Sequence, residues 1–134
     1  MAQQNKLAIG PVEQISVKPG GSVRQELKVT VLPGLHVNND KPKDDFIIPL
    51  KLTWNSGPLE VKSISYPKPE EIQVGGHTLT VFTGTFKIQT DFEAPQHAQV
   101  GMTTLIGKLH YQACNNQMCF RPGTIDVRLP VVIE

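Results

Sequence analysis

The sequence has little cysteine and no excess of positive or negative charge. Both features limit the classes of function that the protein can have. Thirteen basic residues balance twelve acidic ones over 134 residues, so the chain shows no electrostatic footprint for nucleic acid or an anionic membrane. Apolar runs are too short to span a bilayer, and the start lacks the charged head and apolar core of a signal peptide. A serine–histidine–aspartate spacing, a phosphate-binding loop and a zinc motif are also missing, which argues against a hydrolase or a nucleotide enzyme.

A helical pattern is missing as well, and the sequence instead predicts short strands. Eleven prolines and eleven glycines interrupt the chain, and no long stretch repeats apolar residues every 3.6 positions. Apolar residues alternate in several segments, which is typical of strands with one buried face. The alternating sets are Leu27, Val29 and Val31; Leu79, Val81 and Thr83, followed after a shift near Gly84 by Phe86 and Ile88; and Ile125, Val127, Leu129, Val131 and Ile133.

About seven to nine such strands predict an all-β fold, an immunoglobulin-like antiparallel β-sandwich. The cysteine spacing of antibody domains is absent, so no disulfide is expected to staple the two sheets. Residues 1–9 are expected to be a disordered lead-in, and residues 10–134 a single domain. Irregular segments cover residues 32–46, 66–77 and 89–102, and long loops on a rigid sandwich often carry function.

The only two cysteines, Cys114 and Cys119, are the candidate chemical groups. They lie in HYQACNNQMCFRPG, between strands predicted over TTLIGKLHYQA and TIDVRLPVVIE. If they flank the tip of this hairpin, their α-carbons lie about 4.5–5.5 Å apart, a distance that a disulfide accepts. By the loop-entropy model such a small ring contributes only about 2 kcal/mol. A disulfide at this position would therefore stabilise the fold only slightly.

Strand alternation predicts that Cys114 lies on the polar, exposed face of its strand, unless a bulge intervenes. The other members of that face are Lys108, His110 and Gln112. An exposed cysteine beside His110 and Arg121 would have a stabilised thiolate.

Three interpretations of the cysteine pair remain open from spacing alone. The pair is redox-active, or it is a purely structural disulfide of a binding or scaffolding module, or it belongs to a soft copper(I) site. The candidate copper ligands are His110, Cys114, Met118 and Cys119. His36, in GLHVNN, is expected to be a structural hydrogen-bonding residue rather than a ligand.

The residues around the cysteines also form a recognisable motif, Tyr-Gln-x-Cys, a short spacer and Cys-aromatic-x-Pro before the last strand. The matching residues are Tyr111, Gln112, Cys114, Cys119, Phe120 and Pro122. An earlier segment has a Gly-x-His motif followed by Asn and Pro, at Gly34, His36, Asn38 and Pro42. Both resemble the periplasmic N-terminal (alpha) domain of the thiol:disulfide interchange protein (DsbD) family, over roughly residues 10–134.

The resemblance implies a periplasmic immunoglobulin-like domain of a Gram-negative inner-membrane protein, which does not itself span the membrane. Its cysteine pair would cycle between disulfide and dithiol without a cofactor or metal. Electrons would come from a thioredoxin-like domain of the same protein. They would go to periplasmic thioredoxin-fold oxidoreductases that act in disulfide isomerisation and cytochrome c biogenesis. In this family pattern Cys119 faces the partner and Cys114 resolves the mixed disulfide.

The resemblance also implies a shaped and shielded site. The residues expected to shape it or to contact the partner are Tyr111, Gln112, Met118, Phe120 and Pro122. The family covers its cysteines with a cap loop, which opens for partners and contains aromatic residues. Residues 66–77 are the candidate cap here, with Tyr66, Pro67, Pro69 and Ile72 as candidate shielding residues.

Overall fold

Every regular element in the described part of the chain is a β-strand. The structure, a computed structural model, describes residues 6–43 and 46–134. No helix there is long and apolar enough to cross a membrane. The strands are β1 (Leu7–Ile9), β2 (Ile15–Val17), β3 (Ser22–Val31), β4 (His36–Asn38), β5 (Lys51–Trp54), β6 (Glu60–Ser65), β7 (Glu70–Val74), β8 (His77–Phe82), β9 (Thr85–Glu93), β10 (Gly101–Tyr111), β11 (Ala113–Cys114) and β12 (Gly123–Ile133).

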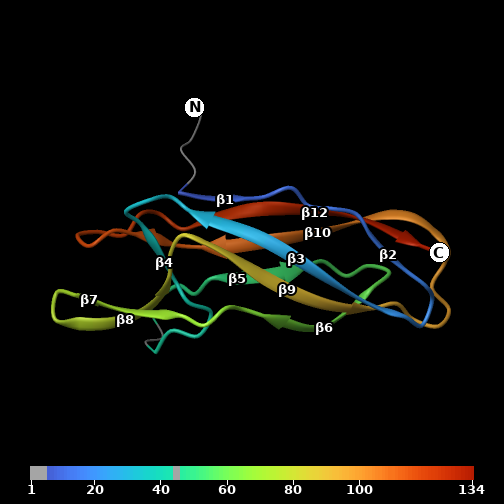
Figure 1. The fold of residues 1–134 in the computed structure, drawn as a ribbon, viewed down its shortest axis with the longest axis horizontal. Helices are drawn as coiled ribbons and strands as arrows, with labels where there is room; N and C mark the ends of the chain where they lie inside the picture. Colours follow the sequence, from blue (N-terminus) through green and yellow to red (C-terminus); the bar gives the residue numbers. More distant parts are fainter. Residues whose placement is uncertain (1–5, 44–45) are drawn as a thin grey trace.

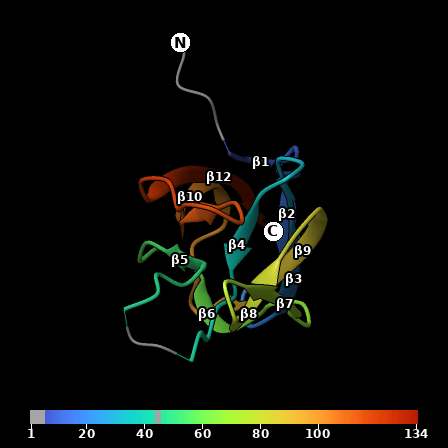
Figure 2. The ribbon, with the colours of Figure 1, turned by 90° about the vertical axis from the view of Figure 1, so that its left-hand side faces the viewer.

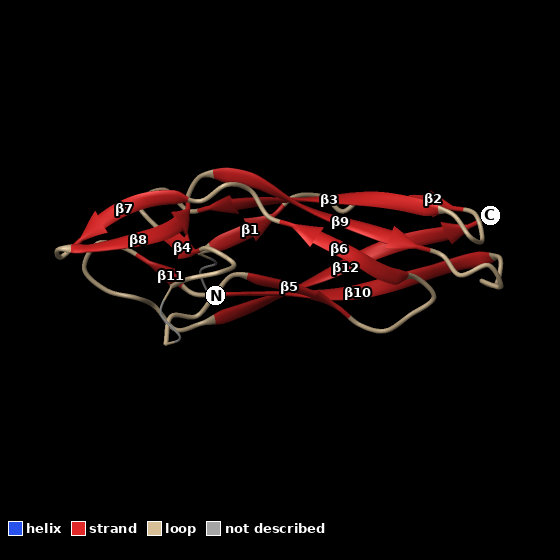
Figure 3. Ribbon diagram, turned by 90° about the horizontal axis from the view of Figure 1, so that it is seen from below, coloured by secondary structure: helices blue, strands red, loops and turns tan. Residues whose placement is uncertain are grey.

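Two four-stranded sheets face each other and form a sandwich (Figure 1). One has the strand order β1-β3-β9-β6 and the other the order β2-β12-β10-β5. Figure 3 shows the two layers edge-on, with the long strands of each sheet running along the molecule. Neighbouring strands are antiparallel, except that β2 pairs with β12 in parallel. The predicted immunoglobulin-like β-sandwich is therefore confirmed.

The alternating apolar residues of β3 and β12 fill the space between the two sheets of the sandwich, as the sequence predicts. Leu27, Val29 and Val31 on β3 are at most 2% exposed, and they meet the buried face of β12 across the core. The shift expected near Gly84 is also present. This glycine has a φ of 65°, a conformation that favours glycine, and the chain leaves β8 there and enters β9 in a different sheet.

Trp54 on β5 contacts β9 of the opposite sheet and so joins the two sheets. Its indole N–H donates to the hydroxyl of Thr90 at 3.1 Å, and its ring packs edge-on against Phe92 with centroids 5.3 Å apart. Gly107, on the strand beside it, leaves room for the ring: a Cβ there would lie 2.7 Å from an indole carbon. The ring fits only because that position has no side chain.

Salt bridges lie on the outer faces of the sheets. Arg24 on β3 contacts Asp91 on β9 at 2.8 Å, and this contact lowers the pKa of the Asp91 carboxyl. Such exposed pairs contribute little to stability, so the fold depends mainly on the apolar core.

The structure differs from the expected lead-in. Residues 1–5 of that segment lie outside the described residues, as do residues 44–45 of the predicted loop 32–46. Residues 7–9, however, form β1, which pairs with β3. Leu7 is 1% exposed, because its side chain completes the core at the edge of the first sheet. The predicted boundary at residue 10 therefore falls after an ordered strand.

A third, smaller sheet extends one end of the sandwich. Its order is β11-β4-β8-β7, and Figure 2 views the molecule from this end. β4 pairs with β8 on one side and with β11 on the other. β7 and β8 form a hairpin that turns at Gly75 and Gly76, both with positive φ, as tight hairpin turns require. The described part has more strands than predicted, because strands as short as β11 show no readable alternation.

Candidate functional site

Cys114 and Cys119 are bonded to each other at the end of the molecule that carries the third sheet. Cys114 ends β11, and Cys119 faces it in an isolated antiparallel bridge. The two α-carbons are 3.9 Å apart, closer than the distance expected from ideal strand pairs. The predicted hairpin position is confirmed. The cysteine segment connects β10 to β12, and these two strands pair along their whole length.

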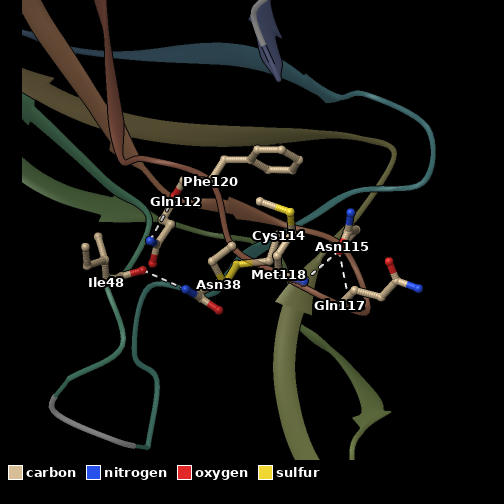
Figure 4. Close-up of a disulfide and its surroundings, with 9 residues drawn as sticks. Asn38, Ile48, Gln112, Cys114, Asn115, Gln117, Met118 and Phe120 are labelled. Atoms are coloured by element: carbon tan, nitrogen blue, oxygen red, sulfur yellow. Dashed lines mark hydrogen bonds between the residues drawn. A yellow bond between two sulfur atoms is a disulfide. The ribbon is translucent and has the colours of Figure 1, made fainter.

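A hydrogen-bonded turn holds the two cysteines side by side (Figure 4). The side-chain oxygen of Asn115 accepts the backbone N–H groups of Gln117 at 2.7 Å and Met118 at 2.8 Å. The N–H of Asn115 donates to the carbonyl of Met118, and the N–H of Phe120 donates to the carbonyl of Ala113. Asn115 thus orders the turn, in the manner of asparagine side chains that bond to nearby backbone.

The two cysteine residues differ in exposure. Cys119 is exposed, whereas Cys114 is only 3% exposed. The prediction that Cys114 lies on the exposed face with His110 and Gln112 is wrong. β10 ends at Tyr111, Gln112 interrupts the strand, and β11 pairs with β4 instead of continuing the ladder. The alternation is therefore reset before Cys114, and that side chain turns inward.

A cavity of about 440 Å³ opens beside the disulfide. Both cysteines line it. Its other walls come from β4, from the segment after β4, from the β7–β8 hairpin and from the turn between the cysteines. The described residues that complete the lining are His36, Asn38, Phe46, Ile47, Val74, Leu79, Gln112, Asn115, Asn116, Gln117 and Met118.

His36 lies beside the disulfide, a position that its expected role as a structural hydrogen-bonding residue did not indicate. It is 4% exposed, lines the cavity, and is the register partner of Cys114 across the β4–β11 pair. Burial lowers its pKa, because a low-dielectric environment disfavours the charged imidazolium. The resemblance to the Gly-x-His motif identified this residue, but its position opposite Cys114 depends on a pairing between distant parts of the chain.

Asn38 and Gln112 hold the walls of the cavity in place (Figure 4). The side-chain amide of Asn38 donates to the carbonyl of Ile48 at 3.0 Å and so ties down the segment after β4. The side-chain amide of Gln112 donates to the carbonyl of Phe120 at 3.0 Å and bridges the two arms of the cysteine segment.

The remaining predicted site residues lie around the disulfide in different environments. Met118 is 53% exposed on the cavity wall. Phe120 is half-buried, with the ammonium of Lys6 4.9 Å above its ring centre, and Pro122 is exposed beyond it. Tyr111 packs in the core, where burial raises its pKa. Its ring lies over Gly123, where a Cβ would be 2.8 Å from the hydroxyl oxygen.

The candidate cap residues do not line the cavity. Tyr66 packs against the core, and its hydroxyl accepts the N–H of Leu52 at 2.9 Å. Pro67, Pro69 and Ile72 are half-buried but are not among the described lining residues. From the predicted cap segment only Val74 reaches the cavity, joined by Leu79 from the other strand of the same hairpin.

Of the four residues in the copper interpretation, His110 does not line the cavity with the other three. His110 is exposed on β10, where a ring nitrogen lies 2.9 Å from the hydroxyl of Thr124, and it is not among the described residues of the cavity wall. Over residues 6–43 and 46–134 there is no group of three or more histidine, cysteine or acidic side chains that could hold a metal ion.

Comparison with known proteins identifies the family. The model of the family described as "Thiol:disulfide interchange protein DsbD, N-terminal" matches residues 4–130. The chain belongs to the DsbD N-terminal domain family. A search of curated protein sequences found no match.

Two solved structures with TM-scores above 0.5 support the fold of this DsbD N-terminal domain, and a third similar structure lies just below that value. The N-terminal periplasmic domain of ScsB from Proteus mirabilis superposes with a TM-score of 0.59 at 16% identity, covering 95% of this chain and 44% of that one. The chain therefore spans less than half the length of the ScsB chain. A type I cohesin from Pseudobacteroides cellulosolvens gives 0.51 at 12% identity, covering 96% and 90%. The DsbD n-terminal domain of Neisseria meningitidis, in the reduced form, gives 0.49 at 18% identity, covering 77% and 73%.

Proposed function

We propose that this DsbD N-terminal domain is a periplasmic thiol–disulfide relay. It accepts electrons from a membrane-bound protein with a thioredoxin-like donor domain and passes them to thioredoxin-fold oxidoreductases. The observation that carries the proposal is the unequal exposure of one bonded cysteine pair. Cys119 is an exposed residue, whereas Cys114 is buried, which favours attack by a protein thiolate at Cys119.

This asymmetry supports a defined sequence of exchange steps. In the dithiol form, the Cys119 thiolate attacks the disulfide of the acceptor, and one sulfur of the acceptor leaves as a thiolate. Cys114 then attacks Cys119, breaks the mixed disulfide and releases the second acceptor sulfur. The acceptor is reduced to a dithiol, and the domain returns to its disulfide. The same steps in reverse reload the domain from the donor.

The surroundings of Cys119 suit contact with a partner. Met118, beside it, is exposed, and an apolar wall formed by residues such as Ile47, Val74 and Leu79 continues from the disulfide. Methionine side chains adapt to differently shaped partners. In this proposal Val74 and Leu79 of the β7–β8 hairpin belong to the surface that contacts the partner beside the exposed Cys119.

The reduction potential of the cysteine pair tests the proposal. The domain is equilibrated in glutathione or dithiothreitol buffers, and its free thiols are then trapped and counted by mass. A potential between about −200 and −270 mV, among the redox proteins, supports the relay. A value below about −300 mV, or no reduction without denaturant, means that the disulfide only pins the hairpin of a binding or scaffolding module.

Trapping the mixed disulfide identifies the partner-facing sulfur. In Cys114→Ser, the lone Cys119 is expected to form a stable mixed disulfide with an oxidised thioredoxin-fold protein, because no second thiol resolves it. Cys119→Ser is the matched control and should form none, since Cys114 is buried. Equal trapping by both variants would contradict the assignment of Cys119 as the attacking sulfur.

A further inference from the structure

His36 and Cys114 occupy directly opposite positions on two paired strands. They are register partners in the antiparallel β4–β11 pair, and opposite residues of such a pair have Cβ atoms about 4.5–5.5 Å apart on the same face. Both side chains are buried, at 4% and 3% exposure, and both line the cavity that leads to Cys119. The imidazole of His36 and the side chain of Cys114 therefore line the same cavity.

The relay needs a proton acceptor in this space. Only a thiolate attacks a disulfide, and a thiol in apolar surroundings loses its proton reluctantly. When Cys114 resolves the mixed disulfide, its proton must go to a group inside the cavity or to a water that reaches it. Among the described residues of the cavity wall, the only titratable side chains are the two cysteines and His36.

His36 is in the right protonation state for this task. Burial lowers the His36 pKa and so favours the neutral imidazole, which is the form that can accept a proton. Burial is the sole cause of that shift. The neighbouring elements also carry acidic, basic and histidine side chains, and none of them contributes to the shift of the His36 pKa. These residues are Glu70 and Glu71 on β7, His77 on β8, and Asp40, Lys41 and Lys43 after β4. Glu70 is engaged by the hydroxyl of Thr83.

We propose that His36 accepts the proton of the Cys114 thiol as that sulfur attacks Cys119 in the mixed disulfide, directly or through one water. This inference rests on the proposed relay. The S–H bond of Cys114 breaks and the proton moves to a ring nitrogen of His36. The Cys114–Cys119 bond forms, and the bond between Cys119 and the partner breaks with its electron pair on the partner sulfur. The imidazolium then returns its proton to solvent or to the departing thiolate.

A small disulfide reagent separates the two steps of exchange. The reduced domain is mixed with 5,5′-dithiobis(2-nitrobenzoate) in a stopped-flow instrument, and the release of the coloured thiolate is followed. The first phase reports attack on the reagent by Cys119, and the second reports resolution by Cys114. In His36→Gln the second phase should slow at least about tenfold at pH 7, while the first phase stays within about twofold of wild type. His97→Gln, in the loop between β9 and β10 at the far end of the sandwich, is the matched control and should change neither phase.

The pH profile separates proton transfer from a loss of packing. With His36 present, the second-phase rate should be level between about pH 7 and pH 9. In His36→Gln it should rise about tenfold per pH unit, because it then depends on the thiolate fraction of Cys114. The variant and the wild type should therefore converge at high pH. A purely structural role for His36 would slow the reaction equally at every pH.

Each outcome decides a different claim. A wild-type domain that shows neither phase overturns the relay, and this inference with it. Two phases with an unchanged second rate in His36→Gln overturn only the role of His36. If the His36→Gln variant does not fold, the pH profile of the wild-type second phase still tests the proposal. A wild-type rate that rises about tenfold per pH unit from pH 7 refutes proton transfer to His36.

Discussion

The turn between the cysteines should set part of the reduction potential, and replacing Asn115 with alanine tests this. The change removes the oxygen that accepts the N–H groups of Gln117 and Met118. The turn holds the two sulfurs together and thereby favours the disulfide over the dithiol. Asn115→Ala should therefore be reduced more easily than the wild type, with a less negative potential.

The size of the effect follows from the two hydrogen bonds. A net contribution of roughly 0.5–1 kcal/mol each, at a half-buried position, gives about 1–2 kcal/mol. For a two-electron couple 1.4 kcal/mol corresponds to about 30 mV, so the shift should be roughly 20–40 mV toward less negative values. The upper figure applies if the turn opens completely in the dithiol form.

The assay is equilibration of the variant and the wild type in the same series of dithiothreitol buffers, followed by thiol trapping. Asn116→Ala changes the exposed neighbour, for which the structure shows no side-chain hydrogen bond, and should leave the potential unchanged. Asn115→Asp keeps an acceptor oxygen and should restore most of the wild-type value. An unchanged potential in Asn115→Ala would refute the reasoning, because backbone hydrogen bonds alone would then hold the ring closed. A more negative potential would refute its sign.

Three further outcomes are expected. Iodoacetamide should alkylate Cys119 before Cys114 in the reduced domain, as read by peptide mass; the reverse order would contradict the burial of Cys114. Gly107→Ala should lower the free energy of unfolding by about 1–3 kcal/mol in urea, because the new methyl group overlaps the Trp54 ring. Asp91→Asn should be slightly less stable than wild type at neutral pH. Because the Asp91 pKa is lowered in the folded state, this contribution is present above the unfolded value of about 3.9. The difference should vanish as the pH falls through the lowered pKa, and a constant difference would exclude the ion pair as its cause.

The long strands were predictable because their residues obey one rule over many positions. On β3 the residues Leu27, Val29 and Val31 alternate with polar neighbours, and they are buried as that alternation requires. β12 repeats the pattern over a longer stretch. Even the break at Gly84 was readable, since the alternation changes there. Two sheets that each have one apolar face bury those faces by packing against each other, which gives a sandwich.

The cysteine site was only partly predictable, because its geometry depends on a change of sheet. Alternation from His110 onward predicts an exposed Cys114, but the chain leaves β10 after Tyr111 and joins β4 through β11. No local pattern marks that transfer. The position of His36 opposite Cys114 follows from the same pairing, and the single-sequence rules of periodicity and turns say nothing about which distant strands meet.

The attachment of the β7–β8 hairpin offers a use in protein engineering. The hairpin joins the rest of its sheet through β4, whose other neighbour carries Cys114. Its tip, Gly75–Gly76, has open space around both α-carbons, and exposed loop tips tolerate insertions. A fluorescent protein inserted there would leave both main sheets uninterrupted, while it is anchored one strand away from the cysteine segment. The insertion would place an optical label close to the disulfide without cutting the sandwich.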